Sequence, residues 1–261
     1  VPYCPVDALL QLAHALLEWL VPFLELLSRW GGAVWSQHAP LAWTVPFAML
    51  GVVWLLAPRG VPSRFLGGVL LWPMFNTPPP LPAPGELWLR FLDVGQGMAV
   101  EARTRHHTLL YDTGPAWGPQ SDAGERVLLP YLRAEGVTAL DTLVVSHDDN
   151  DHSGGAASLL RSLSIGTFIS SLKPDHPLHA VQGTALAYRS ACRSGMAWSW
   201  DGVRFEFLHP GRRPENPFRG TNDDSCVLRI EAGGQRVLLT GDIERIAERE
   251  LLAAGASQLR A

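Results

Sequence analysis

The stretch SHDDNDHSGG, at residues 146–155, directly follows the apolar run TLVV at residues 142–145. It places two histidines and three aspartates within six residues. Carboxylates packed this closely repel one another, and a divalent cation is the usual solution because it neutralises them and accepts imidazole nitrogens as ligands. If the apolar run is a buried strand, the motif forms a loop at its carboxyl end, where active sites of α/β proteins usually lie.

Three other interpretations of this stretch were considered. A calcium loop of the EF-hand type requires a glutamate at its twelfth position, which is Leu160 here, so this interpretation is rejected. A helix amino terminus with acidic caps needs one aspartate and not three. A solvated acidic turn without a metal stays open for the motif taken alone, because short motifs produce false positives.

Charge is distributed unevenly along the 261 residues. Only three basic and three acidic residues precede position 85, and all other charges follow it. We therefore expect membrane helices in residues 1–76, a stiff proline-rich linker over residues 77–85 and a water-soluble domain over residues 86–261. The formal net charge of −4 argues against a simple electrostatic clamp for nucleic acid.

Three apolar stretches precede the linker. Residues 41–57 reach the lower length limit for a membrane span, and residues 65–75 would span only together with their flanks. Residues 8–27 carry Glu18 and Glu25, so they would lie in the membrane interface or pack in a larger bundle. A buried soluble core is the alternative for all three stretches.

Orientation in the membrane follows from the basic residues. Arg59 and Arg64 lie in the loop between the second and third apolar stretches, and the positive-inside rule places such a loop in the cytoplasm. We therefore expect a multi-pass protein of the cytoplasmic (inner) membrane, with its soluble domain on the outer, periplasmic face.

The soluble part alternates strands and helices. Strands are predicted at residues 87–93, 98–103, 108–112, 142–147, 167–170, 203–208, 226–231 and 236–240, and helices at 125–135, 156–163 and 244–254. This order predicts stacked sheets covered by helices. Cys4, Cys192 and Cys226 show no CxxC spacing and an odd count, so they predict neither a disulfide nor a zinc site.

Two further carboxylates follow predicted strands. Asp112 begins the sequence DTG after an apolar run, and Asp242 follows Gly241 after another. The alternative for each residue taken alone is an Asx-turn or a helix cap. Three strand-end carboxylate sites in one domain nevertheless favour a shared metal centre.

Five motifs occur in the order seen in the metallo-β-lactamase superfamily: FLDVGQG at residues 91–97, YDTG at 111–114, SHDDNDH at 146–152, NDDS at 222–225 and LTGD at 239–242. Together with the apolar helices before them, they resemble the ComEC-type competence proteins of DNA internalisation. The resemblance implies an α/β (α+β) metallo-β-lactamase-like αββα sandwich, preceded by short transmembrane or interfacial helices that end a channel domain.

The resemblance also implies a ligand set. His147 and Asp149 would bind one divalent metal ion, and Asp151 and His152 would bind a second. Asp242 would bridge the two ions.

Other roles follow from the same resemblance. Asp112 would orient the ligands from behind, and Asp151 would also orient or deprotonate the attacking water. The third-motif histidine of the superfamily is absent, and Asn222 or Asp224 would replace it. Because Asp149 stands where the superfamily motif has a histidine, the ligand set favours manganese or magnesium, with zinc possible.

The function implied is DNA uptake in natural transformation, with the soluble domain a metal-dependent nuclease that degrades the strand not transported. The partners implied are DNA, membrane lipid, the remainder of the competence channel and other DNA-uptake proteins. One alternative is a non-catalytic module that guides DNA, and another is a membrane-anchored hydrolase of a small ester or lactam. The family's His-His-Gly-Ser motif would follow Ala261, so we expect a fragment in which the second metal lacks a ligand.

Overall fold

A computed structural model describes residues 5–30, 35, 37–58, 60–183, 185–211 and 221–255. Arg59 and Cys4 lie outside these residues. The chain divides into two compact units, Val1–Gln37 and His38–Ala261. The predicted division at the proline-rich linker, with domains at 1–76 and 86–261, stays a prediction.

The helix of the first unit is α1 (Pro5–Ser28), and its side chains are exposed to solvent. Over Val6–Ser28 it is long and apolar enough to cross a membrane, judged by length and composition. The sequence instead favoured residues 41–57 as a span. That stretch forms the shorter helix α2 (Thr44–Leu56), with 13 residues, whereas a span needs about 20.

Helix α2 packs against α3 (Leu66–Asn76) through glycines. A Cβ added to Gly51 would lie 2.6 Å from the carbonyl oxygen of Gly67, and one added to Gly67 would lie 2.5 Å from the carbonyl oxygen of Gly51. Glycine at both positions therefore lets the two backbones approach closely, as small residues do in membrane helix pairs. The guanidinium of Arg64 closes the connecting loop by donating to the carbonyl oxygen of Leu55.

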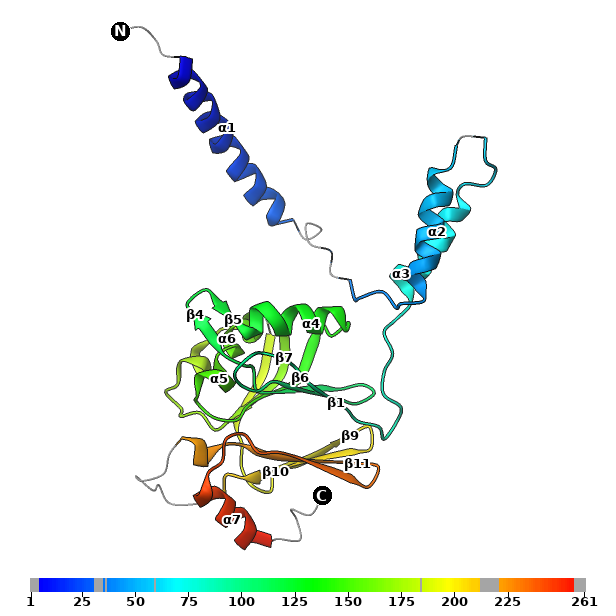
Figure 1. The fold of residues 1–261 in the computed structure, drawn as a ribbon. Helices are drawn as coiled ribbons and strands as arrows, with labels where there is room; N and C mark the ends of the chain where they lie inside the picture. Colours follow the sequence, from blue (N-terminus) through cyan, green and yellow to red (C-terminus); the bar gives the residue numbers. More distant parts are fainter. Residues whose placement is uncertain are drawn as a thin grey trace. The chain divides into compact units, whose positions relative to one another are not determined.

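The remainder of the second unit contains two sheets with helices outside them, an αββα sandwich, as the sequence resemblance implied (Figure 1). The larger sheet has six strands, in the spatial order β1 (Trp88–Phe91), β2 (Val100–Arg103), β3 (Thr108–Tyr111), β6 (Ala139–Val145), β7 (Ser164–Ser170) and β8 (Ala185–Ala191). The smaller sheet has four strands, in the order β12 (Gln235–Leu239), β11 (Val227–Ala232), β10 (Val203–His209) and β9 (Ala197–Trp200).

Strand directions explain where the carboxyl ends meet. Strands β1, β2 and β3 pair antiparallel, whereas β3, β6, β7 and β8 pair parallel. The smaller sheet is antiparallel throughout. Because β3 and β6 are parallel neighbours, the residues that follow Tyr111 and Val145 lie side by side at the carboxyl ends of these two strands.

The helices lie outside the two large sheets (Figure 1). The helical segments are η1 (Gly124–Leu128, a π-helical turn), α4 (Leu129–Ala134), α5 (Asn150–Ser153), α6 (Ala156–Ser162), η2 (Pro177–Ala180), η3 (Asn222–Asp224) and α7 (Arg245–Gly255). A small hairpin of β4 (Ala116–Gly118) and β5 (Ser121–Asp122) follows β3. The sequence did not predict this hairpin or strands β8 and β9.

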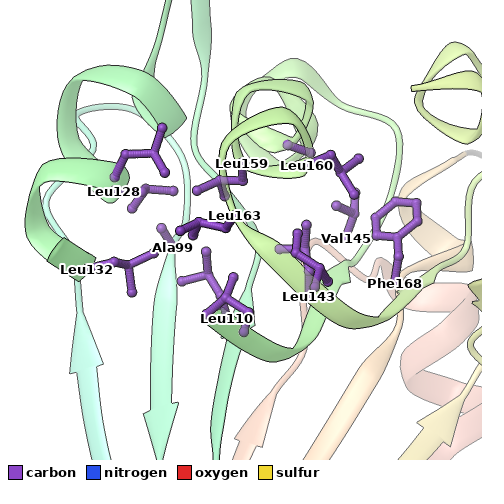
Figure 2. Packing of buried hydrophobic residues seen from close by; sticks show 14 of the residues in the cluster. Ala99, Leu110, Leu128, Leu132, Leu143, Val145, Leu159, Leu160, Leu163 and Phe168 are labelled. Carbon is purple, nitrogen blue, oxygen red and sulfur yellow. The ribbon is translucent and has the colours of Figure 1, made fainter. Parts of the chain in front are cut away.

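Alternating side chains of the larger sheet fill two apolar cores. Leu110 and Leu143 face helix α6, where they join Leu159 and Leu160 (Figure 2). Leu109 and Tyr111 belong to the core between the two sheets. Burial of one such leucine side chain stabilises the fold by about 1.5–3 kcal/mol, so both faces of β3 hold its carboxyl end in place.

Candidate metal centre

Asp112 organises the site from beneath. It follows β3, is fully buried and has a left-handed φ of 59°, a conformation that aspartate tolerates better than most residues. Its carboxylate accepts hydrogen bonds from the backbone N–H of Ser146 (2.6 Å), the hydroxyl of Ser146 (2.8 Å) and Nδ1 of His152 (2.7 Å). Asp112 thereby fixes the ring of His152 with Nε2 facing away from it.

His147 and His152 lie next to each other, with ring centroids 4.3 Å apart. Nδ1 of His147 is 2.9 Å from the Ser146 hydroxyl, so its Nε2 faces outward as well. That Nε2 is buried and has no hydrogen-bond partner among the described residues. The carboxylate of Asp149 lies 3.5 Å from it, without hydrogen-bond geometry. A buried polar atom without a partner is costly unless something outside the chain satisfies it.

Asp242 completes a group of three possible ligands. It follows β12, and its Oδ1 lies 3.3 Å from Nε2 of His152. One ligand atom each from His147, His152 and Asp242 lie within 4.8 Å of one another. The preceding Gly241 has a φ of 56°, and a Cβ there would lie 2.9 Å from Cβ of Ser225 and 3.1 Å from Cβ of Ser146. Glycine is therefore required for Asp242 to come this close.

The remaining predicted ligands lie at the mouth of this group. Asp149 and Asp151 are about half and one-third exposed, and Oδ2 of Asp151 lies 3.9 Å from Nε2 of His152. Burial disfavours the charged form of His152, but the hydrogen bond to Asp112 and the charges of Asp112, Asp242 and Asp151 outweigh it, so the pKa of His152 is raised. The site therefore attracts positive charge.

The third-motif position is occupied differently from the sequence proposal. Asn222 is half-buried, with Nδ2 3.4 Å from Glu244, and the group around His147 includes neither Asn222 nor Asp224. The buried residue of η3 is Asp223, whose Oδ1 accepts the backbone N–H groups of Glu244 and Ala247 at the start of α7. Nothing in the motif NDDS predicted that its second residue would accept the backbone N–H groups at the start of α7.

Ser225 also borders the site, although it was not among the predicted site residues. It is fully buried, and its hydroxyl oxygen has no hydrogen-bond partner within the described residues. That oxygen lies 3.0 Å from the Cβ position of Gly241, next to Asp242.

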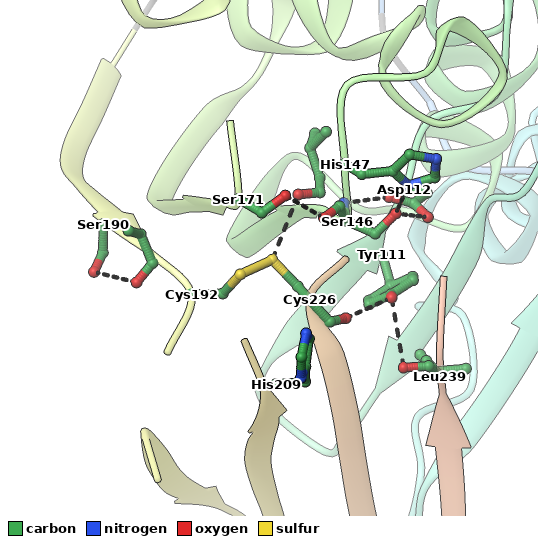
Figure 3. The surroundings of a disulfide bond; sticks show 12 residues. Tyr111, Asp112, Ser146, His147, Ser171, Ser190, Cys192, His209, Cys226 and Leu239 are labelled. Carbon is green, nitrogen blue, oxygen red and sulfur yellow. Dashed lines mark hydrogen bonds between the residues drawn. A yellow bond between two sulfur atoms is a disulfide. The ribbon is translucent and has the colours of Figure 1, made fainter. Parts of the chain in front are cut away.

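A disulfide between Cys192 and Cys226 lies behind the site and links the two sheets (Figure 3). Its Cα atoms are 5.8 Å apart. The backbone N–H of Cys226 donates to the carbonyl oxygen of Ser146 at 2.9 Å, and the hydroxyl of Tyr111 donates to the carbonyl oxygen of Cys226 at 2.6 Å. Burial and the charge of Asp112 raise the pKa of Tyr111 well above its usual value, so Tyr111 stays a donor.

The model of the family described as the metallo-beta-lactamase superfamily matches residues 92–260. The chain belongs to this superfamily. It is 34% identical over 252 residues to Competence protein ComA of Neisseria gonorrhoeae, covering 97% of this chain and 33% of that protein. It is also 34% identical over 217 residues to the uncharacterized protein YcaI of Escherichia coli (strain K12), covering 80% of this chain and 26% of that protein.

The chain thus spans between a quarter and a third of the length of these two relatives. Among solved structures, it is similar to the metallo-beta-lactamase fold protein YhfI from Bacillus subtilis, with 17% identity and a TM-score of 0.38, covering 62% of this chain and 58% of that one. The family match and the similarity to ComA confirm the resemblance drawn from the five motifs.

The superfamily fold implies a divalent metal ion, and the residues present fit one. Two buried imidazoles present Nε2 to the same point, one of them without a partner, and the carboxylate of Asp242 lies beside them. Imidazole and carboxylate together suit first-row divalent metals. Asp112 and Ser146 hold the other ring nitrogens, which is the supporting arrangement that metal-binding histidines usually have.

Proposed function

We propose that the sandwich is a metal-dependent phosphodiesterase that degrades one strand of DNA while the other strand is taken up across the cytoplasmic membrane. The observation that carries this proposal is the unpartnered, buried Nε2 of His147 beside His152 and Asp242. The similarity to Competence protein ComA supports DNA as the substrate. The proposed partners of the protein are the remainder of the competence channel, the membrane lipid around it and other DNA-uptake proteins.

Five residues would bind the metal ions, and one of them would also act on the attacking water. His147, Asp149, Asp151, His152 and Asp242 would hold two divalent ions, with manganese or magnesium favoured by the three carboxylates and zinc possible. Bound there, such ions would supply polarisation of a phosphate oxygen and a lower pKa for water. Asp151, at the open side of the site, would orient the attacking water and take its proton.

The buried residues keep the site in order before substrate arrives. Asp112 and Ser146 fix both imidazole rings through hydrogen bonds of 2.6–2.9 Å. The two imidazoles therefore need no reorganisation on binding, and preorganised groups of this kind supply much of the rate enhancement of enzymes.

The outer face of the membrane is the proposed location of the sandwich. Disulfides persist in oxidising compartments such as the periplasm and are rare in the cytosol, so the Cys192–Cys226 bond supports this location. Helix α1 supplies a candidate span. Reaction of the two cysteines with a thiol reagent in intact cells, without prior reduction, would contradict this location.

Cleavage of end-labelled single- and double-stranded DNA by the chain in detergent tests the activity. Manganese, magnesium, zinc and a chelator are compared, and we expect cleavage only with a metal ion. Asp151→Asn should lower the rate by roughly 10²–10⁴-fold, the usual contribution of a general base. Asp148→Asn is the matched control, because Asp148 pairs with His176 at 2.8 Å and is not among the five proposed metal ligands.

Each result discriminates between functions. Asp151→Asn cleaving at the wild-type rate would remove Asp151 from the mechanism, and cleavage in chelator would remove the metal. Binding of DNA and metal without cleavage would replace the nuclease by a module that guides DNA. Turnover of a chromogenic lactam in place of DNA would identify a hydrolase of small molecules.

A further inference from the structure

Trp117 lies on the β4–β5 hairpin, and its side chain is 52% exposed. A large aromatic ring exposed on a short hairpin offers a flat face on which another ring can stack. The hairpin follows the Asp112 turn along the chain, so Trp117 is only five positions after the residue that organises the metal centre. Both features point to a role at the mouth of the site.

Asn150 ties this hairpin to the metal motif. Its side-chain Oδ1 accepts the backbone N–H of Ala116 at 3.2 Å, and its Nδ2 donates to the carbonyl oxygen of Ala116 at 3.0 Å. Asn150 lies between Asp149 and Asp151, so one residue of the motif holds the backbone immediately before Trp117. The position of Trp117 is thereby fixed relative to two of the proposed ligands.

Two other contacts hold the hairpin in place. Gly154 lies so close to Ala116 that an added Cβ would collide with the Ala116 backbone nitrogen. At the other strand, the hydroxyl of Ser158 donates to Asp122 at 2.6 Å. Both strands of the hairpin are therefore held by contacts with the rest of the domain, and these contacts fix the backbone that carries Trp117.

A cavity of about 370 Å³ opens between the hairpin and the metal motif, lined by Gln96, Pro115, Ala116, Trp117, Asn150 and Asp151. Its walls combine the flat ring of Trp117 with the amide of Gln96. The carboxylate of Asp151 is on the same cavity, so a molecule that fills it lies next to the proposed site of hydrolysis. The backbone N–H of Met98 donates to the carbonyl oxygen of Asp151 at 3.2 Å, which fixes the turn that carries Gln96.

We propose that Trp117 is the stacking platform for a base of single-stranded nucleic acid, placed so that the adjoining phosphate reaches the metal centre. The inference rests on the proposed function and names the form of its substrate. A base within a duplex has both faces covered by its neighbours, whereas an unpaired base can stack on an aromatic ring.

Charge supports a contact through bases at this site. The chain has a net charge of −4, and Asp148, Asp149 and Asp151 lie within one loop. These carboxylates repel a phosphate backbone unless cations are bound. Stacking on Trp117 is insensitive to this repulsion and tolerates every base, which suits an enzyme that degrades a strand of any sequence.

The test measures binding of fluorescent oligonucleotides to the chain in detergent by fluorescence anisotropy. Chelator is present so that no cleavage occurs. Trp117→Ala should weaken binding of single-stranded oligothymidylate by roughly 5- to 100-fold, the range measured for stacked bases. Trp117→Phe should restore most of the affinity. Tyr188→Ala is the matched control, because Tyr188 is an exposed aromatic residue of β8 outside the cavity.

An oligomer of the same length with a sugar-phosphate backbone and no bases separates stacking from general damage. Trp117→Ala should leave its binding unchanged. Equal loss for this oligomer, or unchanged binding of oligothymidylate, would overturn the inference. Weaker partition of the variant into lipid vesicles together with unchanged oligothymidylate binding would also overturn it, because Trp117 would then be a membrane contact. Since binding is measured without turnover, failure of the nuclease proposal would appear separately, as absence of cleavage.

Discussion

Two clusters of histidine and aspartate lie at opposite ends of strand β3, and they differ in one respect. At the amino end, His106 and His107 surround Asp201, and at the carboxyl end His147 and His152 lie above Asp112. Both clusters place imidazole nitrogens within 3.3 Å of a hydrogen-bond partner. Composition alone would rank them as equal candidates for a metal centre.

At the amino end, the carboxylate of Asp201 is satisfied within the chain, whereas His106 and His107 are 65% and 33% exposed, so their other ring nitrogens can reach water. The carboxylate of Asp201 accepts hydrogen bonds from the backbone N–H of His106 (2.8 Å), the hydroxyl of Thr104 (2.7 Å) and Nδ1 of both histidines (2.9 and 3.3 Å). His107 also stacks on Trp200, with ring centroids 4.9 Å apart. These contacts join the β2–β3 turn to the β9–β10 turn, so the role of this cluster is structural.

The cluster at the carboxyl end is satisfied only on its inner side. Asp112 and Ser146 hold Nδ1 of each histidine, while the nearest carboxylates lie 3.3–3.9 Å from the Nε2 atoms. These carboxylates surround the Nε2 atoms, and His147 Nε2 is buried without a partner among the described residues. The comparison teaches that a metal centre is marked by a buried ligand atom that has no partner among the described residues.

The largest effect is expected from Asp112→Ala. The change leaves the Ser146 backbone N–H, the Ser146 hydroxyl and His152 Nδ1 without their buried acceptor. Removing one member of a buried, hydrogen-bonded ion pair costs about 3–5 kcal/mol, so the free energy of unfolding in urea should fall by that amount. The parallel change Asp201→Ala should cost much less, because His106 is exposed and can turn to water. Equal losses would abolish the distinction between the clusters.

A metal ion should act on one cluster only. Manganese or magnesium at about 100 times its dissociation constant should stabilise the wild-type chain by about 2.7 kcal/mol, measured as a rise in the unfolding midpoint that chelator reverses. His147→Ala should lose most of this rise, since it removes the unpartnered Nε2. His106→Ala, the matched control, should keep it. A rise that survives in His147→Ala and disappears in His106→Ala would move the metal to the other end of β3.

Part of this arrangement was predictable from sequence because it depends on local patterns. The apolar runs before Asp112 and His147 predicted two strand ends, and parallel pairing of β3 and β6 brings them together. The resemblance carried by the five motifs also implied the sandwich. The two strand ends carry their own signal in the residues that form them, so a single sequence is enough to find them.

The rest depends on contacts between residues far apart in the chain. The Cys192–Cys226 bond joins residues 34 positions apart, and an odd cysteine count gave no pairing. Strand β8 is an edge strand whose exposed residues lack an apolar pattern. The role of Ser225 becomes visible only once the close approach of Gly241 is known. The sequence therefore predicted the strand ends that carry the site, but not the disulfide, the edge strand and the buried serine, which depend on contacts between distant residues.

The smallest effect is expected at the amino-end cluster, and it depends on pH. Hydrogen bonds from His106 first, and from Thr104 next, hold the pKa of Asp201 well below its usual range. A carboxyl group whose pKa is lowered by folding stabilises the folded state above its unfolded pKa, near 3.9, and loses this contribution as the pH falls toward its folded pKa. Asp201→Asn removes the charge, and asparagine tolerates the left-handed φ of 50° at this position.

The unfolding midpoints of wild type and Asp201→Asn should therefore differ slightly at pH 7, with the variant lower, and begin to converge below about pH 4. Thermal unfolding of both proteins in chelator from pH 7 to pH 3 measures this difference. A gap that stays constant or widens in acid would show that the charge of Asp201 does not hold the turns together. Because chelator leaves no ion at either end of β3, convergence would show that this cluster is stabilised by its own hydrogen bonds. The carboxyl-end cluster lacks such partners at Nε2 of His147, which is why only that cluster should respond when the metal is restored.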